Sequence, residues 1–272
     1  MTVPTRSRST RGKTQPGRLA RLDAFVSLRE RALLTRSDGD YQDALFVDVG
    51  FGQTLATTLE SLEAFRLAGF RGRVVAVDID EKRVELARQQ HGAEVDVRTG
   101  GFELPLREGE HARLVRAMNV LRQYREQEVP DAWERMGRNL VEGGLLLEGT
   151  SSKHGSMLSS HLLRKTSGGL RREGLLFSTT FVRGFAPMQM RDYLPRDLRR
   201  RVVAGERIAT FFDAWTAAWQ EARAEGYRAP PLVFAESGRR LASRLAGIDT
   251  APGLLESGYL LWKPPEGVPR AG

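Results

Sequence analysis

The segment Asp48–Thr54 places an acid and two closely spaced glycines directly after a short apolar run. Gly50 and Gly52 allow the backbone to turn tightly and to approach a ligand without an intervening side chain. A dinucleotide-binding fingerprint would carry a third glycine where Leu55 stands, and the Gly-Lys pair of a phosphate-binding P-loop is absent. The acid Asp48 ahead of the glycines instead favours a cationic, amine-bearing ligand.

A second acid ends the next apolar run, Val74–Asp78. A carboxylate at the tip of the second strand of a parallel sheet can accept hydrogen bonds from both hydroxyls of a ribose. We therefore expect Asp78 to hold a ribose and its neighbour Ile79 to lie beside the same ligand. Asp80 is expected to cap the helix that follows, because its side chain can accept hydrogen bonds from the first backbone N–H groups of that helix.

The elements that must position these residues follow a regular alternation of apolar runs and helical patterns. Strands are expected at 44–49, 73–77, 93–97, 113–118 and 144–147. Helices are expected between them, starting near Thr54, Asp80 and Pro130, and the last of these is expected to stop at Gly143–Gly144. Nearly continuous Val, Leu and Ile runs are typical of parallel strands covered on both faces. The pattern predicts an α/β fold with a doubly wound, mostly parallel sheet and flanking helices.

As a set, these motifs resemble the class I S-adenosylmethionine-dependent methyltransferases, over about residues 44–150. The glycine segment resembles the family's first motif, and Val77-Asp78 its second. Leu140–Leu146 resembles the Leu-x-Pro-Gly-Gly turn before the fifth strand, with Glu142 in place of proline. The chain also looks like a group of uncharacterised bacterial methylase-like proteins. The resemblance implies a Rossmann-like fold and S-adenosylmethionine as cofactor, its methionine half cradled by the Gly50–Gly52 backbone and its ribose held by Asp78.

One position departs from the family pattern. After the third strand the family usually places an acid that accepts a hydrogen bond from the adenine amino group, and Gly101 stands there instead. Phe102 is expected to stack on adenine, and Glu103 or a backbone carbonyl to accept from its amino group. Losing one such hydrogen bond weakens binding by about 1 kcal/mol, so S-adenosylmethionine remains the expected cofactor, with Gly101 and Phe102 at its adenine.

Candidate catalytic residues follow the fourth and fifth strands. Asn119 is expected to contact the cofactor or to orient an amine, or else only to stabilise a turn. Tyr124 is expected to flank a planar acceptor or to pack in the core. Glu148 ends a buried strand, so it is expected to face a cavity or to pair with a cation such as Arg122. His154 is the one imidazole expected near this edge, as a base or as an ordinary surface residue.

Other chemistries lack their residues. The four histidines show no metal-ligand spacing, so no metal site is expected. The chain has no cysteine, which excludes a thiolate nucleophile of the kind that C5-pyrimidine methylation needs. The Asn/Asp-Pro-Pro-Tyr/Phe motif of one class of exocyclic-amine methyltransferases is also absent after the fourth strand.

Three regions are expected along the chain: a disordered basic arm (1–17), a cofactor-binding domain (18–185) and a mainly helical extension packed on it (186–272). A helix over Leu19–Leu34 is expected to lead into the domain. Two strands joined by Gly168–Gly169 form an expected hairpin over 158–181. Helices are expected over 206–224 and near 238–245, followed by a strand-like tail, Tyr259–Trp262. Either the hairpin or the tail is expected to supply the last antiparallel strand.

The charge distribution raises a question about partners. Residues 1–36 and 164–201 each carry a net charge of +7, whereas the whole chain carries +8. Two basic zones favour RNA as the unidentified methyl acceptor, while the helical extension favours a small metabolite under a lid. A third hypothesis is an inactive methyltransferase-like module that binds nucleic acid. The arm is expected to lie away from the carboxyl edge of the sheet. Without a transmembrane or signal segment, the protein is expected in the cytoplasm.

Overall fold

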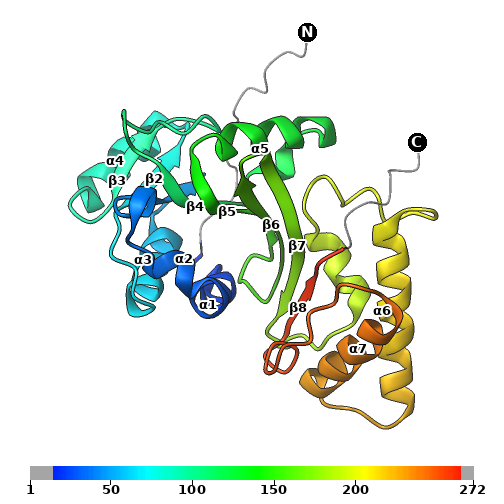
Figure 1. The fold of residues 1–272 in the computed structure, drawn as a ribbon. Coiled ribbons are helices and arrows are strands. Elements are labelled where there is room, and N and C mark those ends of the chain that lie inside the picture. The colour runs from blue at the N-terminus through cyan, green and yellow to red at the C-terminus, as the bar shows by residue number, and fades with distance from the viewer. Residues whose placement is uncertain (1–14, 265–272) are drawn as a thin grey trace.

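The computed structural model describes residues 15–264, which form a single mixed sheet with helices on both faces (Figure 1). The sheet has eight strands in the order β3-β2-β1-β4-β5-β6-β7-β8. Their bounds are β1 Leu45–Val49, β2 Val74–Asp78, β3 Asp96–Thr99, β4 Ala112–Met118, β5 Leu140–Ser151, β6 Met157–Thr166, β7 Gly169–Thr179 and β8 Tyr259–Trp262. Strands β1 to β5 pair in parallel, and β6, β7 and β8 add three antiparallel pairings. The doubly wound, mostly parallel α/β fold is confirmed.

Helices cover the parallel part of the sheet on two sides. They are α1 Ala20–Arg29, α2 Arg31–Thr35, α3 Ala56–Leu67, α4 Glu81–His91 and α5 Val129–Gly137. Apolar residues of the first four pack with one face of the sheet, and those of α5 pack with the other face (Figure 1). This division follows from the chain order, because right-handed crossovers from β1 to β2 to β3 place both connecting helices on one side.

The carboxy-terminal part builds its own core against the antiparallel strands. Helices α6 Arg207–Ala224 and α7 Pro230–Arg244 lie beside β7 and β8 (Figure 1). Phe211 and Trp215 of α6 pack on Phe177 of β7, with ring centroids 5.2 and 5.6 Å apart, and Phe234 of α7 lies 5.7 Å from Trp215. The aromatic stripe expected along this helix is therefore core packing.

Several boundaries differ from the sequence expectation. The first helix divides at Glu30 into α1 and α2. Helix α5 ends at Gly137, and Gly143–Gly144 lie inside the twelve-residue strand β5 rather than at a helix end. Gly143 has a φ of 81°, which a side chain would strain, so its role is a strand irregularity. Both the hairpin and the tail supply antiparallel strands, so the two alternatives were not exclusive. Residues 1–14, most of the expected arm, lie outside the described part of the chain.

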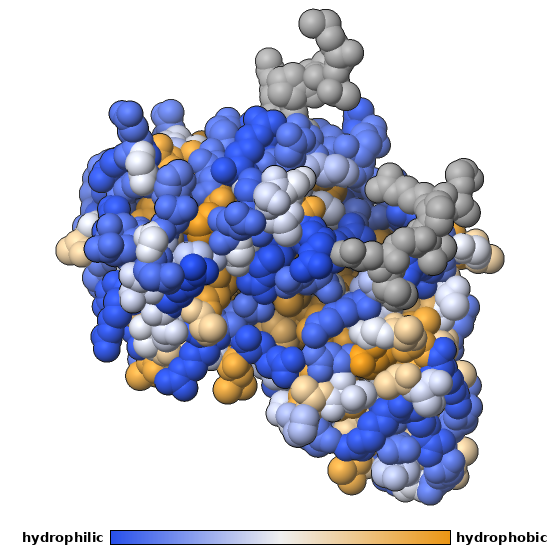
Figure 2. Space-filling model, in the orientation of Figure 1, coloured by the Kyte–Doolittle hydropathy of each residue, from blue (hydrophilic) through white to orange (hydrophobic). Residues whose placement is uncertain are grey.

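Across residues 15–264, the longest apolar helical stretches fall short of what a bilayer crossing requires. In the orientation of Figure 1, the surface is largely hydrophilic, and hydrophobic residues gather near the junction of the sheet with the carboxy-terminal helices (Figure 2).

Candidate functional site

The glycine loop joins β1 to α3 at the carboxyl edge of the sheet. Gly50 and Gly52 have φ angles of 73° and 86°, in the left-handed region where glycine is favoured. The Gly50 backbone N–H donates to the Val77 carbonyl at 2.6 Å. The Gly52 N–H donates to an oxygen of the Asp78 carboxylate at 3.3 Å. The loop and the tip of β2 are therefore hydrogen-bonded to each other, and they lie at the ends of adjacent strands.

Asp78 has a carboxylate held by backbone groups on both sides. Its other oxygen accepts from the Asp80 N–H at 3.0 Å, and the Arg83 guanidinium lies 3.8 Å away. Burial raises the pKa of Asp78, and the hydrogen bonds from Asp80 and Gly52 oppose that rise. A carboxylate has about four acceptor positions, so two donors leave room for the hydroxyls of a ligand. The neighbouring Ile79 is half-buried.

Asp80 caps α4. Its carboxylate accepts hydrogen bonds from the backbone N–H groups of Lys82 and Arg83 at 3.1 and 3.3 Å. The predicted cap by Asp80 is thus confirmed, at the start of the helix. Asp78 faces the glycine loop, and its role at a ribose stays a prediction.

Asp48 differs from its expectation. Arg116 of β4 binds both of its oxygens, at 3.0 and 2.8 Å, and the Thr58 hydroxyl donates at 2.6 Å. The cationic partner of Asp48 is therefore the Arg116 side chain, which takes the place that we expected the amine of a ligand to occupy. Arg116 was missed by the motif analysis, although a charged residue in a continuous apolar run was a signal that a buried partner had to exist.

The same arginine reaches the amino-terminal helix. Arg116 is fully buried and lies 2.9 Å from the Asp23 carboxylate of α1. Ser61 of α3 donates to Asp23 at 2.9 Å and also contacts Arg116. Burial raises the pKa of Asp23 to about 6, against the opposing effects of Arg116 and Ser61. This buried network connects α1 and α3 to the strand that begins the glycine loop.

Asn119 follows β4 in the left-handed conformation, with a φ of 63°. Its backbone N–H donates to Gly149 at 2.7 Å, and its side-chain amide both donates to and accepts from Ser151, at 3.0 Å each. Arg18 donates to the same Ser151 hydroxyl at 3.0 Å. Arg18, the residue directly after the expected arm, therefore lies at the carboxyl edge. The prediction that the arm itself stays away from this edge concerns residues that lie mostly outside the described part of the chain.

The adenine candidates lie at the end of β3. Phe102 is 1% exposed and its ring centroid lies 5.3 Å from that of Tyr124, which is also 1% exposed. Both rings belong to the core on the α5 face, next to the buried Gly101. Glu103, expected as an alternative acceptor, is exposed and forms an ion pair with Arg135 at 2.6 Å.

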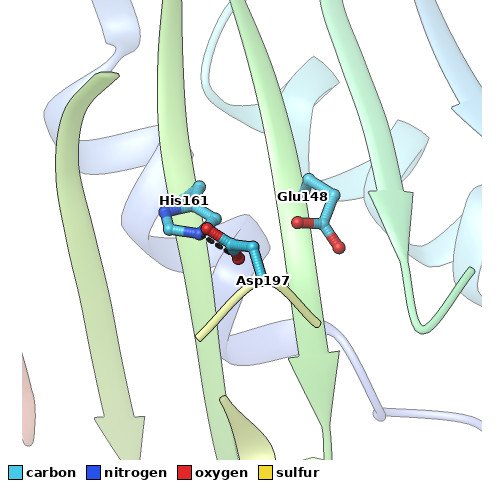
Figure 3. Close-up of side chains that lie close together, drawn as sticks. All are labelled: Glu148, His161 and Asp197. Carbon is cyan, nitrogen blue, oxygen red and sulfur yellow. Dashed lines mark hydrogen bonds and ion pairs between the residues drawn. The ribbon is translucent and has the colours of Figure 1, made fainter. Parts of the chain in front are cut away.

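Glu148 lies deeper, with a side chain that is 1% exposed. It is not paired with Arg122, which is exposed. His161 of β6 and Asp197 lie beside it (Figure 3), and Trp133 and Arg172 are also nearby. Burial and the Asp197 carboxylate raise the pKa of Glu148 well above its usual value. His154 is exposed in the turn between β5 and β6. The sequence analysis missed His161 and Asp197, because they come from β6 and an irregular segment that no motif linked to β5.

Residues 47–147 match the family model described as a methyltransferase domain. This part of the chain is similar to the methyltransferase domains that the model describes. It contains the glycine loop, both acids and most of the expected site residues. A search of curated proteins found no match to the chain.

Solved structures that are similar to this chain share little sequence with it. An amino pentose methyltransferase from Micromonospora echinaspora is 20% identical, over 62% of this chain and 69% of its own, with a TM-score of 0.36. Magnesium protoporphyrin IX methyltransferase from Synechocystis PCC 6803 is 19% identical, over 48% and 53%, with a TM-score of 0.34. The match to the citrinin polyketide synthase CMeT domain has 17% identity and a TM-score of 0.34, and covers 39% of this chain and 28% of that one.

Proposed function

We propose that this protein binds S-adenosylmethionine at the carboxyl ends of β1 and β2 and transfers its methyl group to an acceptor. The observation that carries the proposal is the hydrogen bond between the Gly52 N–H and Asp78, inside the segment that matches the methyltransferase family model. It brings a loop with two glycines, which carry no side chain, and a carboxylate with remaining acceptor capacity to one edge of the sheet.

The residues of this edge fit the parts of the cofactor. Gly50 and Gly52 would leave their backbone accessible to the methionine half, because neither carries a Cβ. Asp78 would accept from the ribose hydroxyls, with Ile79 beside it. Gly101 and Phe102 would lie at the adenine; the Phe102 ring has to turn away from Tyr124 to stack on it. Asp48, in the strand that leads into the loop, would hold the start of the loop in place through its ion pair with Arg116.

The chemistry requires little of the protein beyond alignment. When bound, the cofactor supplies an already activated methyl group on a sulfonium, so the chain must orient the acceptor's lone pair and exclude water. Asn119 lies at the edge between β4 and β5, with its amide fixed by Ser151, and we propose it as a positioning residue for cofactor or acceptor. Tyr124 and Glu148 are each 1% exposed, so we propose supporting roles for them rather than contact with the acceptor.

We propose a small molecule as acceptor. Many cations of the basic zone 164–201 are committed within the chain: Arg164 to Glu30 and Glu173, Arg172 to Asp197, Arg201 to Glu206 and Arg196 to the Tyr124 carbonyl. Such ion pairs leave fewer charges for phosphates. The inactive nucleic-acid-binding alternative is weakened by the same pairs and by the intact contact between glycine loop and Asp78.

Thermal unfolding with added ligands tests the proposed function. At about 100 times its dissociation constant, a ligand that binds only the folded state stabilises it by roughly 2.7 kcal/mol. S-adenosylmethionine and S-adenosylhomocysteine should each raise the Tm, whereas NAD, which shares the adenosine but brings a pyrophosphate, should not. A shift with NAD alone would contradict the assignment of the glycine loop.

A further inference from the structure

Three side chains from separate parts of the chain converge between the sheet and the segment that leads to α6. Glu148 and His161 are direct partners in the pairing of β5 with β6, and Asp197 lies between the helical turn Pro187–Tyr193 and α6. One ligand-type atom from each lies within 4.8 Å of the other two. The carboxylates of Glu148 and Asp197 point toward the His161 ring (Figure 3).

These side chains are almost completely enclosed, yet two of them carry a polar atom without a hydrogen-bond partner. Glu148 is 1% and His161 0% exposed, and the Asp197 side chain is 13% exposed. Within the described residues, Oε2 of Glu148 and Nδ1 of His161 are each buried without a hydrogen-bond partner. The imidazole Nε2 is occupied by Asp197 at 2.8 Å. A buried carboxylate oxygen without a donor is strongly unfavourable, and a cation at this point would remove that penalty.

The arginine next to the cluster does not fill this role. The Nη2 atom of Arg172 lies 3.0 Å from Asp197, and its guanidinium lies 5.2 Å from the centre of the Trp133 ring. That same tryptophan meets the His161 ring edge to face, at 5.0 Å. Arg172 therefore supports the outer oxygen of Asp197, in the way that hydrogen-bonded partners orient the carboxylates of metal sites. The other oxygen of Asp197 bonds His161, which lies beside Glu148.

We propose that Glu148, His161 and Asp197 bind a divalent transition-metal ion of the Zn²⁺ type. One imidazole nitrogen and two carboxylate oxygens are a ligand set that such ions accept, with a solvent molecule completing the coordination. Bonds of about 2.0–2.2 Å put the ligands of one ion roughly 3–4 Å apart, so the cluster must contract by about 1 Å and His161 must exchange Asp197 for the ion. Asp197 belongs to an irregular segment and can make that adjustment.

The ion would connect parts of the molecule that are distant in sequence. Glu148 and His161 belong to the sheet, whereas Asp197 belongs to the segment that carries α6 and α7. A bound ion would thus link the sheet to the segment that carries the carboxy-terminal helices. It would lie on the α5 face, separate from the glycine loop. It raises the stability of the folded chain because the three ligands are together only in the folded state.

Metal titration of the full-length chain, first freed of metal with a chelator, tests this inference. Zn²⁺ should bind at one ion per chain by calorimetry and raise the Tm, and Co²⁺ should give the visible absorption of a low-symmetry site. Glu148→Gln and Asp197→Asn, which keep the side-chain shape, should each weaken Zn²⁺ binding at least tenfold. His91→Ala is the matched control, because His91 pairs with Glu94 at 3.9 Å on the exposed end of α4; it should bind like the wild type.

The outcomes separate cleanly. Failure of the folded wild-type chain to bind Zn²⁺ or Co²⁺ overturns the inference, as does equal binding by the wild type and Asp197→Asn. Loss of binding in His91→Ala would assign the ion to the surface and would overturn it too. If Glu148→Gln does not fold, the partly exposed Asp197 still provides the decisive variant. Binding of S-adenosylmethionine is measured separately, so failure of one proposal is not failure of the other.

Discussion

At the scale of single residues, Asp78 and Asp80 show how two neighbouring acids acquire different roles. The cap by Asp80 was predicted from the sequence and is confirmed, because a helix start determines which backbone donors a carboxylate can reach. The ribose contact of Asp78, predicted from its place at a strand tip, stays a prediction. Asp48 could not be assigned this way. Its partner Arg116 lies 68 positions later in the chain, and only the pairing of β1 with β4 brings them together. Local motifs predict local bonds and miss this one.

The two neighbouring acids make a matched pair of variants. Asp78→Asn should weaken S-adenosylmethionine binding at least tenfold, because an amide retains only one acceptor atom for the ribose hydroxyls and loses the charge. Asp80→Asn should leave the affinity unchanged, since asparagine also caps helices. Calorimetric titration of both variants measures the difference. The opposite order of effects would mean that the ribose contact is assigned to the wrong acid.

The buried network around Arg116 gives a test of pH dependence. Folding raises the pKa of Asp23 from 3.8 to about 6, so the folded state binds this proton more tightly than the unfolded state. The contribution of Asp23 to stability is therefore full below about pH 4 and is lost as the pH rises through about 6. Asp23→Asn lacks this titration.

Urea unfolding of the wild type and Asp23→Asn should be compared at several pH values. The stability of the wild type relative to the variant should increase as the pH falls from about 6 to about 4. Arg116→Met should cost about 3–5 kcal/mol at neutral pH, because it leaves two buried acids without their cation. A difference between wild type and Asp23→Asn that does not change with pH would contradict the raised pKa.

At the scale of elements, the strands and helices of the parallel half could be predicted from the sequence. Strands that are buried on both faces consist of nearly continuous apolar runs, which are easily recognised. The ends of the strands were predicted less accurately than their existence. Strand β5 runs from Leu140 to Ser151, far beyond the expected 144–147. The sequence of its two glycines is typical of a helix end. In the structure they lie instead where the register of the pairing between β4 and β5 shifts. The helix α7 was expected only near its end, because Pro230 begins it without a side-chain cap.

Helix α6 provides a prediction at this scale. Trp215 is fully buried among aromatic rings and donates its indole N–H to Ser237 of α7 at 3.1 Å. Trp215→Ala should therefore cost about 3–5 kcal/mol in urea unfolding. Leu232→Ala, at an α7 position that is 58% exposed, should change stability by less than about 0.5 kcal/mol. Equal effects of the two substitutions would mean that α6 does not pack on the sheet in this way.

At the scale of the whole molecule, some of the charges in the basic zones form ion pairs within the protein. Arg164 lies between Glu30, at the junction of α1 and α2, and Glu173 of β7, at 2.8 Å from each. It therefore joins the amino-terminal helix to the hairpin. Charge counts give the sum of a zone, but they do not show which charges are already paired.

Phosphate binding by this protein, if measured in a salt series with single-stranded RNA, should come from the amino-terminal arm. Deleting residues 1–14 removes Arg6, Arg8, Arg11 and Lys13. The slope of log affinity against log salt should then become shallower by roughly 0.7 for each phosphate that is no longer neutralised. Arg164→Gln should leave that slope unchanged and lower stability by about 1–3 kcal/mol. The deletion stops before Gly17, because its N–H donates to Glu60 at 2.9 Å. An unchanged slope after the deletion would exclude the arm from RNA binding.

The measurement that bears most directly on the proposed function is a calorimetric titration of S-adenosylmethionine into the full-length wild-type protein. The glycine loop and Asp78 predict saturable binding of one molecule per chain, with S-adenosylhomocysteine competing for the same site. Absence of binding at about millimolar cofactor, in protein whose cooperative unfolding shows that it is folded, would contradict the account at its centre.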